Sequence, residues 1–220
     1  MIDLHTHTFF SDGVLLPSEL IQRARKTGYR ALAITDHVDS SNMEHVIKSI
    51  KKVCSETGRA YKDIICIPGV ELTHIPLKLV SLLTERARRL GAGIVVFHGE
   101  TTVEPVEPGS NNAAIKAGVD ILAHPGKITD ADAELAAKKN VMLEITARRG
   151  HNLTNRHVAN TAKKAGAKLV FDTDAHMPGD LVDKNKRKKI LGASGLGSAE
   201  IRGVVKNSEK LVRKFTGKKA

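Results

Sequence analysis

Seven short apolar runs recur along the chain, and each ends in or beside a histidine or a carboxylate. Buried β-strands read this way in a sequence, because both faces of such a strand are covered. The runs lie at residues 2–7, 31–37, 67–71, 94–98, 121–124, 141–144 and 169–176. We therefore expect seven strands, each with a polar side chain at or near its carboxyl end.

Segments with the apolar spacing of helices separate these runs. The first is expected to begin at Pro17 and to stop at Gly28, with proline early and glycine late, as helices prefer. The others span about 43–57, 77–90, 112–117, 130–139, 155–165, 180–191 and 199–215. Repeated alternation of strand and helix predicts parallel strands joined by right-handed crossovers.

A closed barrel and an open doubly wound sheet both satisfy this alternation. An open sheet gathers its functional side chains at one switch point, whereas a barrel brings every strand end to one mouth. Nearly every run here carries a potential ligand, which favours a barrel of seven βα units. We predict a single domain over residues 1–220, with C-terminal helices at about 180–215 packed on the barrel.

The composition narrows the function classes only slightly. The chain is 41% hydrophobic but only 3% aromatic, which argues against a stacking surface for single-stranded nucleic acid. Its net charge of +11 indicates either a solvated basic surface or attraction for phosphorylated ligands or nucleic acid. Cys54 and Cys66 lack a CxxC spacing, so we expect no disulfide framework and a reducing cytoplasm. Neither a signal peptide nor a membrane span is expected.

Histidines and carboxylates at the ends of the runs form the candidate chemistry. His5 and His7 lie at i and i+2 of the first run, so both rings face the same side of a strand. Asp174 and His176 repeat this spacing in the last run. Any one of these side chains could be a hydrogen-bonded cap, but independent caps have no reason to recur at almost every strand end. Their convergence predicts a divalent metal site.

In ordered combination these motifs resemble the PHP (polymerase and histidinol phosphatase) superfamily. The matching segments are His5-Thr6-His7 with Ser11-Asp12-Gly13, Thr35-Asp36-His37, Gly69-Val70-Glu71, His98, Ala123-His124-Pro125 and Asp174-Ala175-His176. The resemblance covers most of the chain, and it implies a distorted (β/α)7 TIM-like barrel with a trinuclear metal site.

By the family pattern, nine side chains would hold three ions. The first ion would bind His5, His7, Glu71 and Asp174, the second Glu71, His98 and His124, and the third Asp12, His37 and His176. Some family members have histidine at the position of Asp12. Zinc, manganese and iron all accept imidazole and carboxylate ligands, so we expect two or three divalent ions of one of these metals.

A cluster of this kind suits hydrolysis of phosphate esters, because paired cations activate a bridging water and neutralise the phosphoryl oxygens. We expect a metal-dependent phosphoesterase in which a metal-bridged hydroxide, on the pair of ions linked by Glu71, attacks a small phosphorylated substrate. Histidinol-phosphate phosphatase is one activity of the family, and a nucleotide phosphoesterase is another candidate. The alternatives are an exonuclease and a basic RNA-binding barrel like the archaeal ribonuclease P protein subunit. Such an RNA-binding protein need not keep the ligands, all nine of which are present here.

Further side chains are candidates for contact with the substrate. Arg148 and Arg149 could bind phosphate or form an exposed basic loop. His151, in the same loop, could protonate a leaving alcohol. Three more residues could orient a ligand or face the substrate: His74, Glu100 and Glu144. His45 and His157 fall in predicted helices and are expected at the surface.

Overall fold

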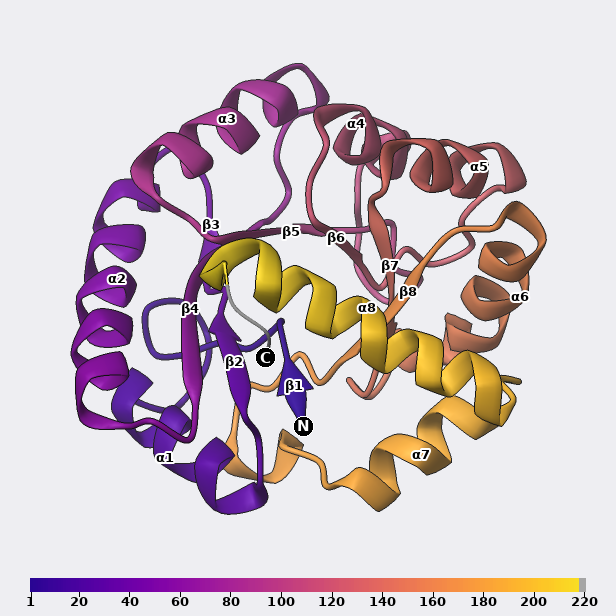
Figure 1. Ribbon diagram of the computed structural model, residues 1–220. Coiled ribbons are helices and arrows are strands. Elements are labelled where there is room, and N and C mark those ends of the chain that lie inside the picture. The colour runs from indigo at the N-terminus through magenta and orange to yellow at the C-terminus, as the bar shows by residue number, and fades with distance from the viewer. Residues whose placement is uncertain (218–220) are drawn as a thin grey trace.

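The computed structural model describes residues 1–217, which fold into a parallel sheet curved into a nearly closed barrel (Figure 1). The strands are β1 (Ile2–Asp3), β2 (Ala31–Ile34), β3 (His37–Val38), β4 (Ile65–Leu72), β5 (Ile94–His98), β6 (Ile121–Ala123), β7 (Met142–Thr146) and β8 (Leu169–Asp172). Their order around the barrel is β1-β2-β4-β5-β6-β7-β8, with β3 paired to β4. The predicted α/β fold, a distorted TIM-like barrel, is confirmed.

The second predicted run is divided between two strands. β2 and β3 both pair in parallel with the long strand β4, one with its first half and the other with its second half. The ring closes beyond the ends of β1 and β8, where the amide of His7 donates to the Ala175 carbonyl at 2.8 Å. The amide of Asp174 donates in return to the His5 carbonyl at 3.0 Å. This closure places the two His-containing segments side by side.

Helices surround the barrel as the sequence pattern predicts. They are α1 (Pro17–Thr27), α2 (Met43–Ala60), α3 (Val80–Leu90), α4 (Ser110–Ala117), α5 (Asp130–Lys139), α6 (Asn155–Ala165), α7 (Lys184–Ala193) and α8 (Ser198–Thr216). Short 3-10 turns occupy Leu77–Leu79, His151–Thr154 and Pro178–Asp180. Gly28 ends α1 with a φ of 88°, a left-handed conformation that glycine adopts without steric cost.

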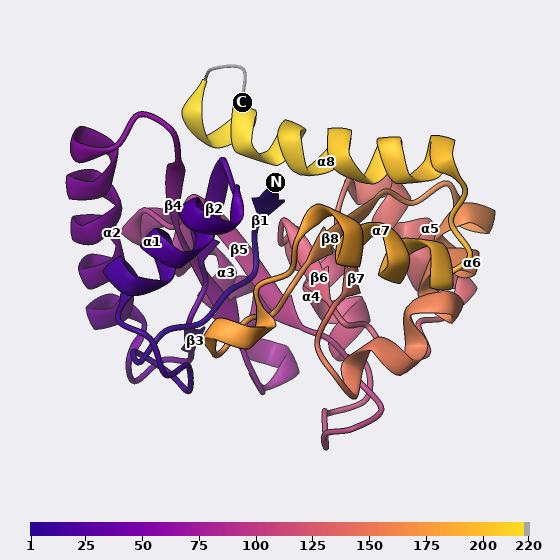
Figure 2. The same ribbon diagram turned by 90° about the horizontal axis from the view of Figure 1, so that it is seen from below.

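Two layers of apolar side chains form the core. Along β2, Ala31 and Ala33 face the barrel interior, whereas Leu32 and Ile34 pack outward against the helices. Leu211 and Val212 of α8 join the interior cluster, and α8 lies across the end of the barrel at which β1 begins (Figure 2). One end of the barrel is therefore covered by α8, which leaves the carboxyl ends of the strands as the open mouth. Among residues 1–217, no helix combines the length and the apolar character that a membrane span requires.

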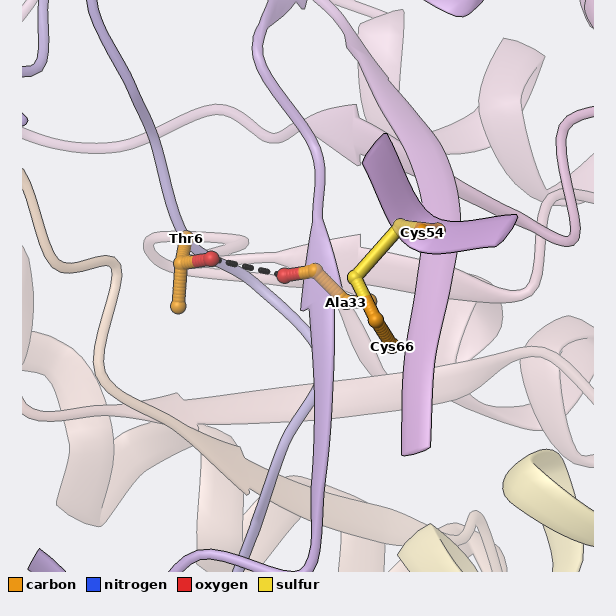
Figure 3. The surroundings of a disulfide bond; sticks show 4 residues. All are labelled: Thr6, Ala33, Cys54 and Cys66. Atoms are coloured by element: carbon orange, nitrogen blue, oxygen red, sulfur yellow. Dashed lines mark hydrogen bonds between the residues drawn. A yellow bond between two sulfur atoms is a disulfide. The ribbon is translucent and has the colours of Figure 1, made fainter. Parts of the chain in front are cut away.

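The two cysteines form a disulfide bond between α2 and β4 (Figure 3). Cys54 and Cys66 are 12 residues apart in the sequence, and their Cα atoms are 5.0 Å apart. The expectation of no disulfide framework did not foresee this bond, which forms because α2 turns back directly onto β4 and brings its last turns against the start of that strand. Near the bond, Thr6 Oγ1 donates to the Ala33 carbonyl at 2.6 Å and ties the segment after β1 to β2 (Figure 3).

Candidate metal centre

The nine predicted ligands come from six parts of the barrel, and all lie at its mouth. Five of the side chains follow or end a strand: His5 and His7 come after β1, His98 ends β5, His124 follows β6 and Asp174 follows β8. The other four are Asp12, His37, Glu71 and His176. Most of them lie near or beyond the carboxyl end of a strand, where the functional residues of a barrel gather, and His37 begins the two-residue strand β3 beside the end of β4.

Four donors surround a common point at the base of the mouth. His5 Nε2 lies 3.3 Å from Glu71 Oε2 and 3.7 Å from Asp174 Oδ1. His7 Nε2 lies 3.5 Å and 3.2 Å from the same two oxygen atoms. Donors about 2.1 Å from a tetrahedral cation are roughly 3.4 Å apart. The four histidine-to-carboxylate distances are therefore close to those around a bound divalent cation, and His5, His7 and Glu71 have donor atoms that all lie within 4.8 Å of one another.

Glu71 connects this group to a second one. Its other oxygen, Oε1, lies 3.6 Å from His124 Nε2, and Glu71, His98 and His124 together have donor atoms within 4.8 Å of one another. A third group forms around Asp12, whose Oδ1 lies 3.1 Å from His176 Nε2 and 3.5 Å from His37 Nε2. The donor atoms thus lie in neighbouring groups that overlap: His7 also belongs to the group of Asp12, His37 and His176, and Asp174 groups with His124 and His151.

Buried polar atoms without hydrogen bonds test whether this arrangement fits cations. Among the described residues, His5 Nε2, both ring nitrogens of His7 and both carboxylate oxygens of Glu71 are buried and make no hydrogen bond of suitable geometry. His98 Nδ1 and His124 Nδ1 share this condition. Leaving so many buried polar atoms unpaired is costly. Divalent cations would satisfy His5 Nε2, His7 Nε2 and the Glu71 oxygens, so the residues present fit the metal ions that the family pattern implies.

The charges in the cluster shift the pKa values in opposite directions. Burial acts against charge on His5, but Glu71 and Glu144 raise the pKa of its ring well above the usual range. Burial also acts against charge on Glu71, yet His5 and His37 hold the pKa of its carboxyl well below the usual range. Burial raises the pKa of Asp174 to about 7. Burial and the neighbouring His37 lower the pKa of His7 well below its usual value.

The backbone at two strand ends is strained. His124 has a φ of 28° and Asp174 a φ of 53°, in the left-handed region that residues with a side chain rarely adopt. Such conformations persist where the surrounding structure holds them, and they concentrate at functional sites. Both residues belong to the donor groups, so the strain accompanies the turn that aims their side chains into the mouth.

Glu144 stands behind the donors. Its Oε1 accepts a hydrogen bond from His5 Nδ1 at 2.7 Å, and its Oε2 accepts one from the His124 amide at 3.0 Å. This contact leaves His5 Nε2 free to face Glu71 and Asp174. Glu144 therefore contacts the ring of one predicted ligand and the backbone of another.

Three further buried carboxylates hold the backbone that carries the ligands. Asp3 accepts from the amide and hydroxyl of Thr173 at 3.1 and 2.6 Å, and Asp172 accepts from the Leu4 amide at 2.6 Å. Asp36 accepts from the Thr8 amide at 2.7 Å and from Ser11 Oγ at 2.7 Å. None of these supporting roles was predicted, although carboxylates within apolar runs are a visible signal for them.

Glu104 is another carboxylate near the donors that the sequence analysis did not predict. It lies in the loop between β5 and α4, and it lines the cavity that contains the donors. Glu104 Oε2 lies 3.0 Å from His98 Nε2 and 3.8 Å from His74 Nε2, and Oε1 lies 3.3 Å from His151 Nε2. Contact with His98 lowers the pKa of the Glu104 carboxyl. No strand-end pattern marks this residue, because a long loop delivers it.

The remaining predicted residues divide into those at the mouth and those away from it. His151 is buried beside His124, with ring centroids 4.2 Å apart, and its Nδ1 is hydrogen-bonded to Thr101 Oγ1 at 2.7 Å. His74 lies on the rim, half exposed. Glu100 does not reach the donors, because its Oε1 accepts from the Gly109 and Asn111 amides at 3.0 and 2.9 Å at the start of α4. The helical His45 and His157 are exposed, as expected.

Two adjoining cavities open at the mouth. The first, of about 240 Å³, is lined by donors of all three groups together with Glu104, His151 and Arg148. The second, of about 560 Å³, is lined by Arg148, Arg149 and Lys186 among others. Arg148 belongs to both walls, and its Nη1 is 3.2 Å from Asp180 Oδ2. Arg149 is exposed and lines only the second cavity.

Comparison with known proteins identifies the family of this chain. The PHP domain profile matches residues 3–92. The uncharacterized protein MJ1295 of Methanocaldococcus jannaschii is 50% identical over 200 residues, covering 90% of this chain and 92% of that protein. A probable phosphatase of Shewanella piezotolerans is 26% identical over 222 residues, covering 88% of this chain and 85% of the relative.

Among solved structures, a chain of archaeal ribonuclease P with mature tRNA superposes with a TM-score of 0.73. The two chains are 17% identical, and the match covers 96% of this chain and 89% of the other. At this identity the likeness concerns the fold alone. The sequence matches and the donor groups lead to one conclusion: the chain belongs to the PHP family of metal-dependent phosphoester hydrolases.

Proposed function

We propose that this protein hydrolyses a small phosphorylated substrate, with two or three divalent cations held by the nine ligands at the barrel mouth. The observation that carries the proposal is the spacing of His5, His7, Glu71 and Asp174, whose donor atoms lie 3.2–3.7 Å apart across the two pairs. Zinc, manganese and iron all suit this set of imidazoles and carboxylates.

Some residues of the protein would hold the cations, and others would position the ligands or the substrate. When bound, the cations supply an activated water nucleophile and neutralise the phosphoryl oxygens. Glu71 lies between two donor groups, so its carboxylate keeps them at a fixed separation. Glu144 fixes the ring of His5 through its 2.7 Å hydrogen bond. His151, in the wall of the smaller cavity, is placed to contact the leaving-group oxygen.

Arg148 is the residue best placed to bind the phosphate group. Its side chain lines the donor-containing cavity, where a guanidinium can bind two phosphate oxygens at once. The hydrogen bond to Asp180 holds it in place without burying it, and Asp180 also accepts from the His176 amide at 2.9 Å. The arginine is thereby tied to the segment that carries two of the ligands.

The adjoining cavity favours one substrate class over another. Arg149 and Lys186 add positive charge to its walls, while the charge of Arg148 is balanced by Asp180. A positive wall attracts a substrate whose remaining part is anionic and repels a cationic one. We therefore favour a nucleotide or another multiply charged phosphate ester over histidinol phosphate, whose remaining part carries an amine.

Hydrolysis of a compound panel tests the proposal. Purified protein is assayed with Mn²⁺, Zn²⁺ or Fe²⁺ against histidinol phosphate, nucleoside monophosphates, nucleoside bisphosphates and short oligonucleotides, with release of phosphate or nucleotide as the readout. We expect metal-dependent turnover of a nucleotide, with a KM below that for histidinol phosphate. If metal-loaded protein cleaves none of these compounds, the proposal is wrong. Turnover of oligonucleotides alone would identify an exonuclease instead.

RNA binding is the second candidate, favoured by the net charge of +11 and by the shared fold. A protein that acts only as an RNA-binding barrel has no need of closely spaced buried donors, so the preserved donor groups favour hydrolysis. The measurement that separates the two is RNA affinity as a function of salt. A steep fall in affinity with salt, together with absence of bound metal and of turnover, would establish the RNA-binding function.

A further inference from the structure

A separate cavity of about 330 Å³ lies away from the metal-binding mouth, beside α7 and α8. It is bounded by the start of β1, the turn between α1 and β2, the middle of β8 and one side of each of the two C-terminal helices. Figure 1 shows these elements next to one another at the end of the barrel that α8 crosses. The proposed function uses none of the residues in this cavity.

Three cationic side chains line the cavity: Arg30, Lys184 and Arg187. Arg30 forms an ion pair with Glu209 of α8, which balances its charge. Within residues 1–217, Lys184 and Arg187 form no ion pair, and Arg187 Nε is buried without a hydrogen-bond partner. A guanidinium left partly buried and unpaired is costly. The cavity therefore has two cationic side chains without an anionic partner among the described residues, and one of them, Arg187, has a buried N–H without an acceptor.

Part of the cavity wall is apolar. Ile2 and Phe171 line it from the barrel, and Val204 and Val205 line it from α8. The cavity volume lies at the small end of the range for pockets that hold small molecules. An apolar wall facing two cations suits a ligand with an apolar or planar body and one anionic group, rather than a bare inorganic ion.

We propose that this cavity binds a small phosphorylated molecule carrying an apolar or planar group, with its phosphate on Arg187 and Lys184. Arginine and lysine both bind phosphate, arginine through two parallel hydrogen bonds. No donor group capable of holding a metal has been found in this wall among the described residues. The proposal therefore concerns binding, and a ligand there would link β1, β8, α7 and α8.

Binding of the phosphonate analogue of AMP tests the proposal. In this analogue a methylene group replaces the ester oxygen, so hydrolysis cannot remove the ligand. Titration of the metal-loaded protein is followed by calorimetry and by amide chemical shifts in NMR spectra. We expect shifts at Gly28, Phe171 and Ser208, which line the cavity. Adenosine, which has the planar group without the anion, should bind at least tenfold more weakly.

Two variants and a matched control locate the phosphate. Arg187→Gln should weaken binding at this site at least tenfold, and Lys184→Gln should weaken it several-fold. Lys188→Gln removes the same charge from α7 at an exposed position outside the cavity, so its affinity should stay within twofold of the wild type. If Arg187→Gln is unstable in a melting experiment, Lys184→Gln alone carries the comparison.

Three results would contradict the proposed binding site. The proposal is overturned if the analogue shifts only amides at the barrel mouth, if adenosine binds equally well, or if Lys184→Gln and Lys188→Gln have the same affinity as the wild type. None of these measurements depends on turnover. Failure here leaves the proposed hydrolase function intact, and failure of the hydrolase assay leaves this site intact.

Discussion

Replacement of Glu71 by glutamine tests the role of the carboxylate that connects two donor groups. The substitution changes an oxygen to an amide nitrogen with almost no change in size. In the wild type, one Glu71 oxygen lies 3.3 and 3.5 Å from His5 and His7, and the other lies 3.6 Å from His124. The glutamine keeps one neutral carbonyl oxygen and turns an amide NH2, which does not bind metal, toward the other donors, so the two cation sites lose the negative charge that they share.

The size of the effect follows from the number of sites that Glu71 serves. An interaction with a charged group contributes about 1.5–3 kcal/mol. Loss of that contribution at two cation sites amounts to about 3–6 kcal/mol, which corresponds to a fall in kcat/KM of roughly 10²- to 10⁴-fold. Folding should persist, because the apolar strands and helices form the core while residues at the strand ends serve function.

The assay compares kcat/KM, bound metal and melting temperature for the wild type, Glu71→Gln and Glu44→Gln. Glu44 is exposed on α2, where it pairs with Arg86 at 2.8 Å, so its variant makes the same chemical change outside the site. We expect Glu44→Gln to match the wild type in turnover and metal content. Full turnover by Glu71→Gln with normal metal content would refute the role assigned to this carboxylate.

Further predictions concern the support of the ligands, the substrate and the stability of the fold. Glu144→Gln cannot accept hydrogen bonds from both His5 and His124, so metal affinity should fall about 10- to 100-fold in a competition titration with a chelator; an unchanged affinity would contradict the orienting role. Arg148→Gln should raise KM about tenfold for the best phosphate ester, as measured by steady-state kinetics, because one charged phosphate contact is lost; an unchanged KM would exclude that contact. Metal added at 100 times its Kd should raise Tm by about 5–10 °C in differential scanning calorimetry, because it binds only the folded state; an unchanged Tm would contradict binding to the native fold. Reduction of the disulfide should lower Tm by about 6–12 °C, because the bond closes a short loop in the unfolded chain; equal Tm values with and without reductant would show that the bond does not stabilise the protein.

The parts of the fold that follow local rules could be predicted from the sequence. The helices 130–139 and 155–165 have the predicted bounds, because their apolar spacing and terminal residues agree. The strand 94–98 likewise follows its apolar run. The division of the second run into β2 and β3 could not be predicted, because it depends on the length of β4, the strand with which both pair.

In the candidate site, too, residues placed by local structure could be predicted, whereas residues placed by loops or by distant packing could not. Ligands that end strands could be found from the chain, because parallel strands in a barrel bring their ends together. Glu104 could not be found in this way, since the position of its carboxylate depends on the path of a long loop. The pairing of Cys54 with Cys66 depends on how α2 returns to β4, which the spacing of the two cysteines does not reveal. Glu100 was predicted near the ligands because it follows His98 by two residues, but its carboxylate instead accepts a hydrogen bond from the Gly109 amide, away from the donors.

The central claim is that the donor groups at the barrel mouth hold divalent cations. Elemental analysis of the purified protein, combined with anomalous diffraction from its crystals, tests this claim most directly. We predict two or three equivalents of zinc, manganese or iron, with anomalous peaks between His5, His7, Glu71 and Asp174 and in the neighbouring groups. Well-ordered side chains with no anomalous peak among them, in protein supplied with these metals, would contradict the account.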